Sequence, residues 1–262
     1  MRITPLFSGS TGNCTLVSTG STCILVDVGK AVKHIEEAVK RAGEDMRGIS
    51  AIIITHEHRD HTSGLKGILK KYDIPVYTTA ETWEVIRERT PGLRSPRFRE
   101  VRPGEVFRIG AALVRAFQIP HDAACPVGYR IEAEGHSFAI ATDIGQAQPG
   151  WLEALRGCNA VMLECNYNED LLSKSDKPEF CKERVRSDHG HLSNEECADV
   201  VVDLVRGGVE HICLGHMSAT SNRPELARDV VTKRLKSAGL VDGKHYGLTI
   251  AERDNVSRSI WL

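Results

Sequence analysis

Apolar and polar positions in the first third of the chain follow two periodicities in turn. Short apolar runs with the length and composition of β-strands are followed by stretches in which apolar residues recur at helical spacing. In residues 31–42 the apolar positions fall on one helical face, and Gly43 is a suitable helix C-terminus. The expected strands are residues 2–7, 14–18, 22–28, 51–54 and 75–79, and the expected helices are residues 31–42, 64–72 and 81–89. This alternation is typical of an α/β fold.

The rest of the chain contains a group of consecutive strands and then alternates again. Strands are expected at residues 106–109, 112–119, 128–133, 137–141, 160–165, 210–214, 248–252 and 257–261, and helices at residues 151–155 and 224–238. Ser193 and Glu196 have the spacing of a capping box, which predicts a further helix after residue 193. Residues 173–186 carry charges of both signs around Pro178, so we expect an exposed excursion or a lid there.

No linker-like stretch divides the chain, so the pattern predicts a single domain over residues 1–262. Each half supplies a sheet with helices on its outer side. Two such halves correspond to a four-layered αβ/βα sandwich.

Composition and charge add few constraints. The 262 residues are 41% hydrophobic and 26% charged, which is enough for a sizeable core. A formal charge of -1 excludes a basic surface over the whole chain, so a polyanionic partner would be met by local basic patches. No apolar segment approaches the roughly 18 residues of a membrane span, and no apolar leader is visible, so we expect a cytoplasmic protein. The eight cysteines include no C-x-x-C pair and are expected to be reduced.

The most distinctive polar cluster follows the apolar run at residues 51–54. The sequence there reads T-H-E-H-R-D-H, so three of the chain's 11 histidines and one aspartate lie within six positions. Because side chains alternate along an extended segment, His56 and His58 point the same way and can hold one divalent ion. Asp60 and His61 come after the turn and can reach a second ion.

The spacing H-x-H-x-D-H resembles the signature of the metallo-β-lactamase fold superfamily. On that pattern His121, Asp143 and His216, each following an expected strand, are the remaining ligands, and Asp143 bridges two ions. Asp27 is expected to orient the metal loop. Zinc suits such a histidine-rich site, and manganese is the alternative because Asp60 and Asp143 offer oxygen. Two ions that share a water and clamp the oxygens of a displacement indicate a hydrolase, with that water as the nucleophile.

Other segments resemble the bacterial YycJ/WalJ group of this superfamily. They are S-G-S-T-G-N-C at residues 8–14, H-D-A-A at 121–124, E-C-N at 164–166, G-H-L-S-N-E at 190–195 and H-M-S at 216–218. This resemblance implies a cytoplasmic exonuclease that degrades double-stranded DNA from 5′ to 3′. The chain departs from the group at Tyr167-Asn168, where a His-Asp pair is expected, and this leaves substrate contacts near residue 167 open.

A wider resemblance, to ribonuclease Z and phosphodiesterase relatives, implies a candidate proton donor. In those proteins a histidine before a capped helix pairs with a glutamate at a strand end, and the matching positions here are His191 and Glu164. The expected catalytic residues are therefore Asp60, Glu164 and His191, with His191 as the general acid. The alternative is that His191 only helps to cap the helix or binds metal.

Two segments are candidates for contacts to substrate. In the turn at residues 8–13, Ser10 and Asn13 can face the metal site and touch a phosphate, although a plain hairpin turn explains the same residues. Residues 87–102 carry six arginines. Arg94, Arg97 and Arg99 among them can grip a nucleic-acid backbone, and a solvated loop is the alternative.

The expected activity is therefore that of a dinuclear metal phosphodiesterase acting on nucleic acid. A hydrolase of a small ester, thioester or lactam is the second hypothesis, and a metal-stabilised binding module without turnover is the third. Asp60 counts against a lactamase, because phosphodiesterase branches are those that pair it with His61 as ligands. The intact ligand set counts against a binding module.

Overall fold

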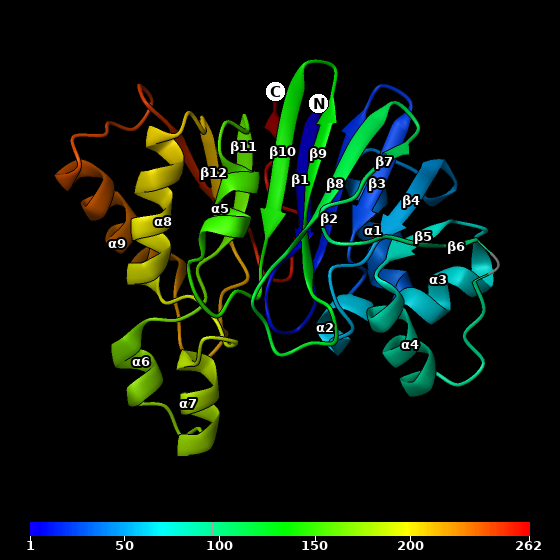
Figure 1. The fold of residues 1–262 in the computed structure, drawn as a ribbon, viewed down its shortest axis with the longest axis horizontal. Coiled ribbons are helices and arrows are strands. Elements are labelled where there is room, and N and C mark those ends of the chain that lie inside the picture. The colour runs from blue at the N-terminus through cyan, green and yellow to red at the C-terminus, as the bar shows by residue number, and fades with distance from the viewer. Residues whose placement is uncertain (96) are drawn as a thin grey trace.

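Two seven-stranded sheets lie face to face in the computed structural model, and helices cover the outer side of each (Figure 1). The structure describes residues 1–95 and 97–262. The strand order is β14-β1-β2-β3-β4-β5-β6 in the first sheet and β13-β12-β11-β10-β9-β8-β7 in the second. The predicted four-layered α/β sandwich is confirmed.

The first part of the chain builds the first sheet and its helices. The strands are β1 (Arg2–Phe7), β2 (Cys14–Thr19), β3 (Thr22–Val26), β4 (Ile49–Ile53), β5 (Val76–Thr78) and β6 (Phe98–Glu100). The helices are α1 (Val32–Arg41), the short 3₁₀ helix η1 (Met46–Gly48), α2 (Arg59–Thr62), α3 (Leu65–Lys71) and α4 (Ala80–Arg89). The last strand of the chain, β14 (Ile260–Trp261), pairs with β1, so the two ends lie side by side (Figure 1).

The second part of the chain builds the second sheet. The strands are β7 (Val106–Ile109), β8 (Ala112–Gln118), β9 (Val127–Ala133), β10 (His136–Ala141), β11 (Ala160–Glu164), β12 (His211–Gly215) and β13 (Gly247–Ile250). The helices are α5 (Pro149–Leu155), α6 (Glu169–Ser173), α7 (Glu179–Arg186), α8 (Asn194–Arg206) and α9 (Pro224–Ser237). The predicted capping box at Ser193 and Glu196 begins α8. None of the helices in the described part of the chain is long and apolar enough to cross a membrane.

Central strands divide their side chains between two layers. In β4, Ala51 and Ile53 pack in the core between the sheets, whereas Ile52, and Ile54 just after the strand, pack under the outer helices of the first sheet. Because both faces of such a strand are buried, its sequence is apolar at every position from Ala51 to Ile54 and then changes abruptly to polar residues. The site therefore begins where the apolar run ends.

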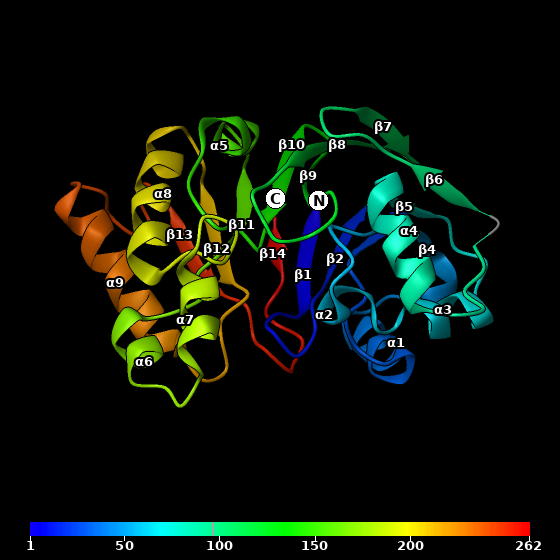
Figure 2. The same ribbon diagram turned by 60° about the horizontal axis from the view of Figure 1, so that its bottom comes forward.

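Three segments differ from the expectations. No strand is expected in the arginine run, but β6 lies within it and pairs in parallel with β5. Residue 96 of this run lies outside the described residues. Residues 59–62, expected as loop, form α2. The excursion expected at residues 173–186 includes α7, which with α6 projects at the same end of the molecule as α2 (Figures 1 and 2). The buried side chain of α7 is that of Lys182, so the helix has no apolar stripe that a pattern could reveal.

Candidate metal centre

The segment T-H-E-H-R-D-H leaves the end of β4 and turns into α2. His56 and His61 are fully buried, and the Asp60 carbonyl accepts a hydrogen bond from Asn13 N–H at 2.7 Å. Gly29 packs against the same carbonyl so closely that a Cβ on it would lie 1.6 Å from the oxygen. Only a residue without a side chain fits there, and this contact fixes where α2 begins.

Three residues of the second sheet face this segment. His121 follows β8, Asp143 follows β10 and His216 follows β12. The backbone φ angles of Asp143 and His216 are +61° and +50°, in the left-handed region that residues with a Cβ rarely adopt. Such strain persists only where surrounding contacts fix the conformation, and it is most common at functional sites.

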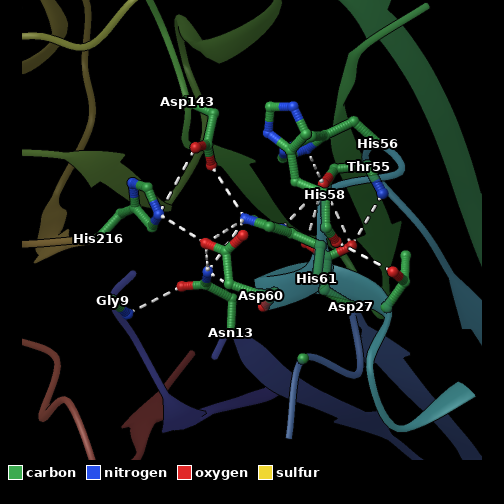
Figure 3. A network of polar contacts seen from close by, with 12 residues as sticks. Gly9, Asn13, Asp27, Thr55, His56, His58, Asp60, His61, Asp143 and His216 are labelled. Atoms are coloured by element: carbon green, nitrogen blue, oxygen red, sulfur yellow. Dashed lines mark hydrogen bonds and ion pairs between the residues drawn. The ribbon is translucent and has the colours of Figure 1, made fainter. Parts of the chain in front are cut away.

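The side chains from the two sheets form two groups joined by Asp143 (Figure 3). Nitrogen atoms of His56, His58 and His121 lie within 4.8 Å of one another, and so do the donor atoms of the second group, which consists of Asp60, His61 and His216. Asp143 Oδ2 lies 3.2 Å from His61 Nε2, and Asp143 Oδ1 lies 3.5 Å from His121 Nε2. The structure thus brings together all seven residues predicted as ligands and places Asp143 between the groups.

These donors fit divalent metal ions. The Nε2 atoms of His56 and His216 are buried and have no hydrogen-bond partner among the described residues. A buried polar atom without a partner costs free energy, and a bound cation would satisfy it. Imidazole nitrogens combined with carboxylate oxygens are the donors that zinc and similar ions take in proteins.

Asp27 and Asn13 form polar contacts that hold the metal-binding loop in place. Asp27 Oδ1 accepts a hydrogen bond from Thr55 N–H at 2.9 Å, and Asp27 Oδ2 lies 2.8 Å from His61 Nδ1, as expected for a residue that orients the loop. Asn13 was expected to touch substrate. Its side-chain nitrogen instead lies 3.2 Å from Asp60 Oδ2 and 3.0 Å from His61 Nε2, and the Asn13 side chain is buried among these residues.

Glu164 connects two histidines at the end of β11. Its Oε1 lies 2.7 Å from His191 Nδ1 and 2.8 Å from His216 Nδ1. Burial would raise the pKa of Glu164, but the charges and hydrogen bonds of the two histidines outweigh it and lower this pKa to about 2. The residue that caps α8 is Ser193, whereas His191 pairs with Glu164.

Electrostatic effects differ between the two groups. Burial lowers the pKa of His56 well below its ordinary value and also lowers that of His121. Burial would likewise lower the pKa of His216, but the neighbouring carboxylates, first of all Asp143, raise it to about 10. Burial would raise the pKa of Asp143, but the His216 charge helps to hold it well below its usual range. Burial would lower the pKa of His61 as well, but Asp27 and Asp60 raise it well above its ordinary value. The carboxylates around His61 and His216 thus favour positive charge there, and a cation that binds these two rings takes the place of their protons.

A cavity of about 360 Å³ opens onto the two groups. Ser10, predicted to contact substrate, lines it together with His191, and so do Arg59, Lys177 and Arg184. The sequence analysis missed these three cations. Arg59 could have been found because it lies inside the metal motif, but the other two reach the cavity only because α7 folds back beside it.

The arginines predicted to hold substrate lie elsewhere. Arg94, Arg97 and Arg99 are absent from the described residues that line the cavity. Arg97 donates a hydrogen bond to the Asp73 carbonyl at 3.0 Å, and Arg99 lies on the edge strand β6. These side chains are therefore placed to meet only a ligand that extends well beyond the cavity.

The two residues that depart from the group pattern have structural contacts. Tyr167 is buried, and its carbonyl accepts a hydrogen bond from Asn194 N–H at 2.8 Å. Asn168 caps α6 by accepting a hydrogen bond from Leu171 N–H at 3.1 Å. The neighbouring Asn166 lines the cavity. Tyr167 and Asn168 thus contribute to the base of the α6 and α7 pair.

Comparison with known proteins relates this site to characterised families. The family model described as a beta-lactamase superfamily domain matches residues 22–217. Exodeoxyribonuclease YycJ of Bacillus anthracis is 33% identical over 94% of this chain and 93% of its own. Exodeoxyribonuclease WalJ of Streptococcus pneumoniae is 30% identical over 92% of this chain and 91% of its own. The crystal structure of YhfI from Bacillus subtilis, a metallo-β-lactamase fold protein, superimposes with a TM-score of 0.71 at 16% identity and covers 98% of this chain and 99% of its own.

Proposed function

Because the chain belongs to the β-lactamase superfamily and, within it, to the YycJ/WalJ group, we propose that it is a dinuclear nuclease. The proposed reaction removes nucleotides from the 5′ ends of double-stranded DNA. Membership of this family makes the protein a metal-dependent hydrolase. The preference for DNA, the direction of degradation and the two ions are parts of the proposal. The exodeoxyribonuclease names of two relatives that match nearly the whole chain support the preference for DNA. The two groups of donor atoms joined by Asp143 support the two ions, and the direction is what the resemblance to the YycJ/WalJ group implies.

We assign the proposed ligands to two ions according to the two groups. His56, His58 and His121 would hold one ion, Asp60, His61 and His216 would hold the other, and Asp143 lies between the two groups. When bound, two such ions lower the pKa of a shared water and stabilise negative charge on the attacking and leaving oxygens. Zinc is the proposed ion because histidines predominate, and manganese is the alternative that the carboxylates allow.

The observation that carries the phosphodiester assignment is the charge of the cavity wall. Arg59, Lys177 and Arg184 line the same cavity as the proposed ligands. Guanidinium and ammonium groups bind phosphate oxygens through charge-assisted hydrogen bonds, whereas a neutral lactam or thioester offers them no anionic partner. A substrate with several phosphates uses such a wall, so the cavity favours a polynucleotide.

His191 is the proposed proton donor for the leaving oxygen. Glu164 engages Nδ1 of the ring at 2.7 Å, which leaves Nε2 as the nitrogen available to a substrate in the cavity that His191 lines. Glu164 also holds His216, so one buried carboxylate aligns a ligand and the proton donor. Asp60 has two proposed roles. It would be a ligand of the second ion, and its negative charge would lie beside the reacting phosphate.

A substrate panel tests this function. Metal-depleted protein is supplied with zinc or manganese and given duplex DNA and RNA labelled at the 5′ or the 3′ end, bis(p-nitrophenyl) phosphate, a lactam and a thioester. We expect ion-dependent release of nucleotides from the 5′ ends of duplex DNA and a preference for the phosphodiester among the small substrates. A preference for the thioester or the lactam would replace the proposal with the small-molecule hydrolase. Turnover of none of these substrates would leave a binding module.

A further inference from the structure

Helix α7 and the segment before it form a wall of the cavity outside the proposed metal ligands. Lys177, two residues before α7, lines the cavity, and so do Arg184 and Val185 within the helix. Figure 1 shows the α6 and α7 pair projecting at the end of the molecule where α2 lies, and Arg59 of α2 lines the same cavity. A substrate strand that leaves the metal centre on this side therefore passes along α7.

The wall is fixed to the centre by direct contacts. The Val185 carbonyl accepts a hydrogen bond from His191 N–H at 2.9 Å, and Arg184 Nη2 donates to Asp122 Oδ1 at 2.9 Å. Arg186 Nη2 donates to Glu169 Oε1 at 2.6 Å, which ties α7 to α6. These bonds give α7 a defined position relative to the proposed proton donor. A ligand that binds to α7 is thereby positioned at the centre.

Phe180 is a large apolar side chain of α7 that packing does not use, and it lies outside the described lining of the cavity. It is 71% exposed, the highest value among the large hydrophobic residues in the described part of the chain. Phe180 and Arg184 are four positions apart in the helix, so the two side chains lie on the same face of α7. A phenyl ring left in water contributes little to folding, because its stabilisation comes from area removed from water. The exposed ring is available to a ligand.

The charges beside Phe180 identify that ligand. In the sequence Phe180 lies between two cations of the cavity wall, Lys177 and Arg184. The Arg184 guanidinium is already paired with Asp122, whereas Lys177 forms no ion pair with any residue that the structure describes. An exposed ring on a helix that borders the metal-binding cavity, three positions along the chain from an ammonium group that lines it, matches a nucleotide, which has a flat base to stack and a phosphate to bind.

We propose that Phe180 is a stacking platform for a base of the substrate strand and that Lys177 binds a phosphate adjoining that base. This inference rests on the proposed nuclease function and names the contact that holds the strand end. In this proposal the terminal nucleotide leaves the duplex stack to place its phosphate at the ions, and this unstacking costs free energy. Stacking on Phe180 offsets part of that cost.

The test compares three Phe180 variants with a matched control. Phe180→Ala, Phe180→Leu and Phe180→Trp are assayed in the metal-loaded protein on a DNA duplex and on bis(p-nitrophenyl) phosphate. Base stacking on an aromatic side chain corresponds to roughly 5- to 150-fold in affinity. We therefore expect Phe180→Ala and Phe180→Leu to lower the ratio of kcat/KM for DNA to that for the small phosphodiester by this order, mainly through KM. Phe180→Trp should retain the ratio.

Trp261→Ala is the control, because Trp261 is also aromatic and 69% exposed but lies on the edge strand β14, away from the cavity lining. The ratio should not change in this variant. A loss in Trp261→Ala equal to that in Phe180→Ala would overturn the proposal, and so would full retention in Phe180→Leu, since leucine is apolar but cannot stack.

A fluorescent base separates stacking from a general loss of structure. A DNA duplex with 2-aminopurine near its 5′ end is bound to protein carrying ions that do not support turnover, and stacking on Phe180 quenches the fluorescence. We expect quenching with wild type and Phe180→Trp and its loss with Phe180→Ala at full metal content. If wild type does not degrade DNA, the proposed function fails and this inference fails with it. If wild type and Phe180→Ala degrade DNA and quench equally, the stacking inference alone is wrong.

Discussion

Several proposed ligand histidines use one ring nitrogen for a fixed protein partner. The pairs are His56 Nδ1 with Thr55 Oγ1 at 3.0 Å, His61 Nδ1 with Asp27 Oδ2 at 2.8 Å, His121 Nδ1 with the Gly190 carbonyl at 3.1 Å and His216 Nδ1 with Glu164 Oε1 at 2.8 Å. Each pairing fixes the orientation of the ring and leaves Nε2 for the site. The sequence shows the histidines themselves, whereas these partners become evident only when the strands are in register.

Removal of the carboxylate between the two groups tests the ion count. We predict that the purified protein holds two ions per chain and that Asp143→Ala loses at least one, because Asp143 contacts His61 of one group and His121 of the other. Elemental analysis of the purified proteins measures this directly. Asp254→Ala is the control, since that aspartate is exposed and pairs with Lys30. Two full equivalents in Asp143→Ala would contradict the bridging assignment.

A second prediction at this scale concerns the leaving group. His191→Ala should keep both ions and lose most turnover of a substrate with a poor alkoxide leaving group, about 10²- to 10⁴-fold for a missing general acid. It should lose far less with p-nitrophenolate, which departs without a proton. Rates on the two substrates and the metal content are measured on the same preparation. Equal losses on both would refute the acid role, and loss of metal would make His191 a ligand.

Elements with a long or fully apolar pattern were predictable, and short or polar ones were not. β1 has the predicted ends, and α8 begins at the predicted cap, because burial on a fixed face leaves a clear pattern. β6 has three residues, two of them exposed, and is held by pairing with β5. The helix α7 is held to α6 by polar contacts, which have no sequence period.

The same reasoning applies to the site. Its proposed ligands were predictable because the H-x-H-x-D-H motif follows an apolar strand and because the superfamily resemblance indicates His121, Asp143 and His216, each near the end of a later strand. Lys177 and Phe180 were not, because both belong to the segment whose helix could not be seen. The wall that we propose to bind substrate is thus the part of the site that required the structure.

A pH measurement tests how α7 is held. The hydrogen bond from Arg186 lowers the pKa of Glu169 below its ordinary value of 4.5. Since this carboxyl has a depressed pKa in the folded protein, its stabilisation is present above pH 4.5 and is lost as pH falls through the lower folded value. We predict that amide hydrogen exchange in α7, corrected for the intrinsic rate, accelerates as pH falls below the ordinary pKa of 4.5 and through the lower folded value. The effect is modest because the pair is partly exposed.

Two variants complete this prediction. Glu169→Gln should show the faster exchange in α7 at neutral pH and lose most of the acid dependence. Glu153→Gln is the control, because it removes an exposed carboxylate of α5 that pairs with Arg156, the residue after that helix. It should leave exchange in α7 unchanged. Slow exchange in Glu169→Gln across the whole pH range would show that the remaining contacts hold α7 without this pair.

At the scale of the whole molecule, the two halves share one core. Ile24 and Ile53 of the first sheet belong to the same buried cluster as Phe138 and Met162 of the second. Separating the halves would expose this cluster to water, and the proposed ligands come from both sides of it. We therefore propose that residues 1–262 fold as one domain. The metal centre lies where the strand ends of both sheets converge.

The arginines at the β6 edge lie where a long DNA duplex can reach them and a short one cannot. Arg94, Arg97 and Arg99 lie on and before the edge strand β6, outside the described cavity lining, so they meet substrate only if the duplex extends across that edge. Replacing all three with Gln should weaken binding of a long duplex and flatten its salt dependence, by a slope of about 0.9 per lost phosphate contact. A duplex too short to reach β6, with bis(p-nitrophenyl) phosphate as internal reference, should respond much less.

The matched control carries the same change of charge on the opposite side of the molecule. Arg206, Arg228 and Arg234 are exposed on the outer helices α8 and α9, and replacing these three with Gln leaves the β6 edge intact. Nonspecific attraction depends on total charge and would flatten the slope equally in both triple variants. A defined path over β6 flattens it only in the first, and only for the long duplex. Equal slopes in wild type and the first variant would show that the arginine run is a solvated surface and that the cations of the cavity wall hold DNA alone.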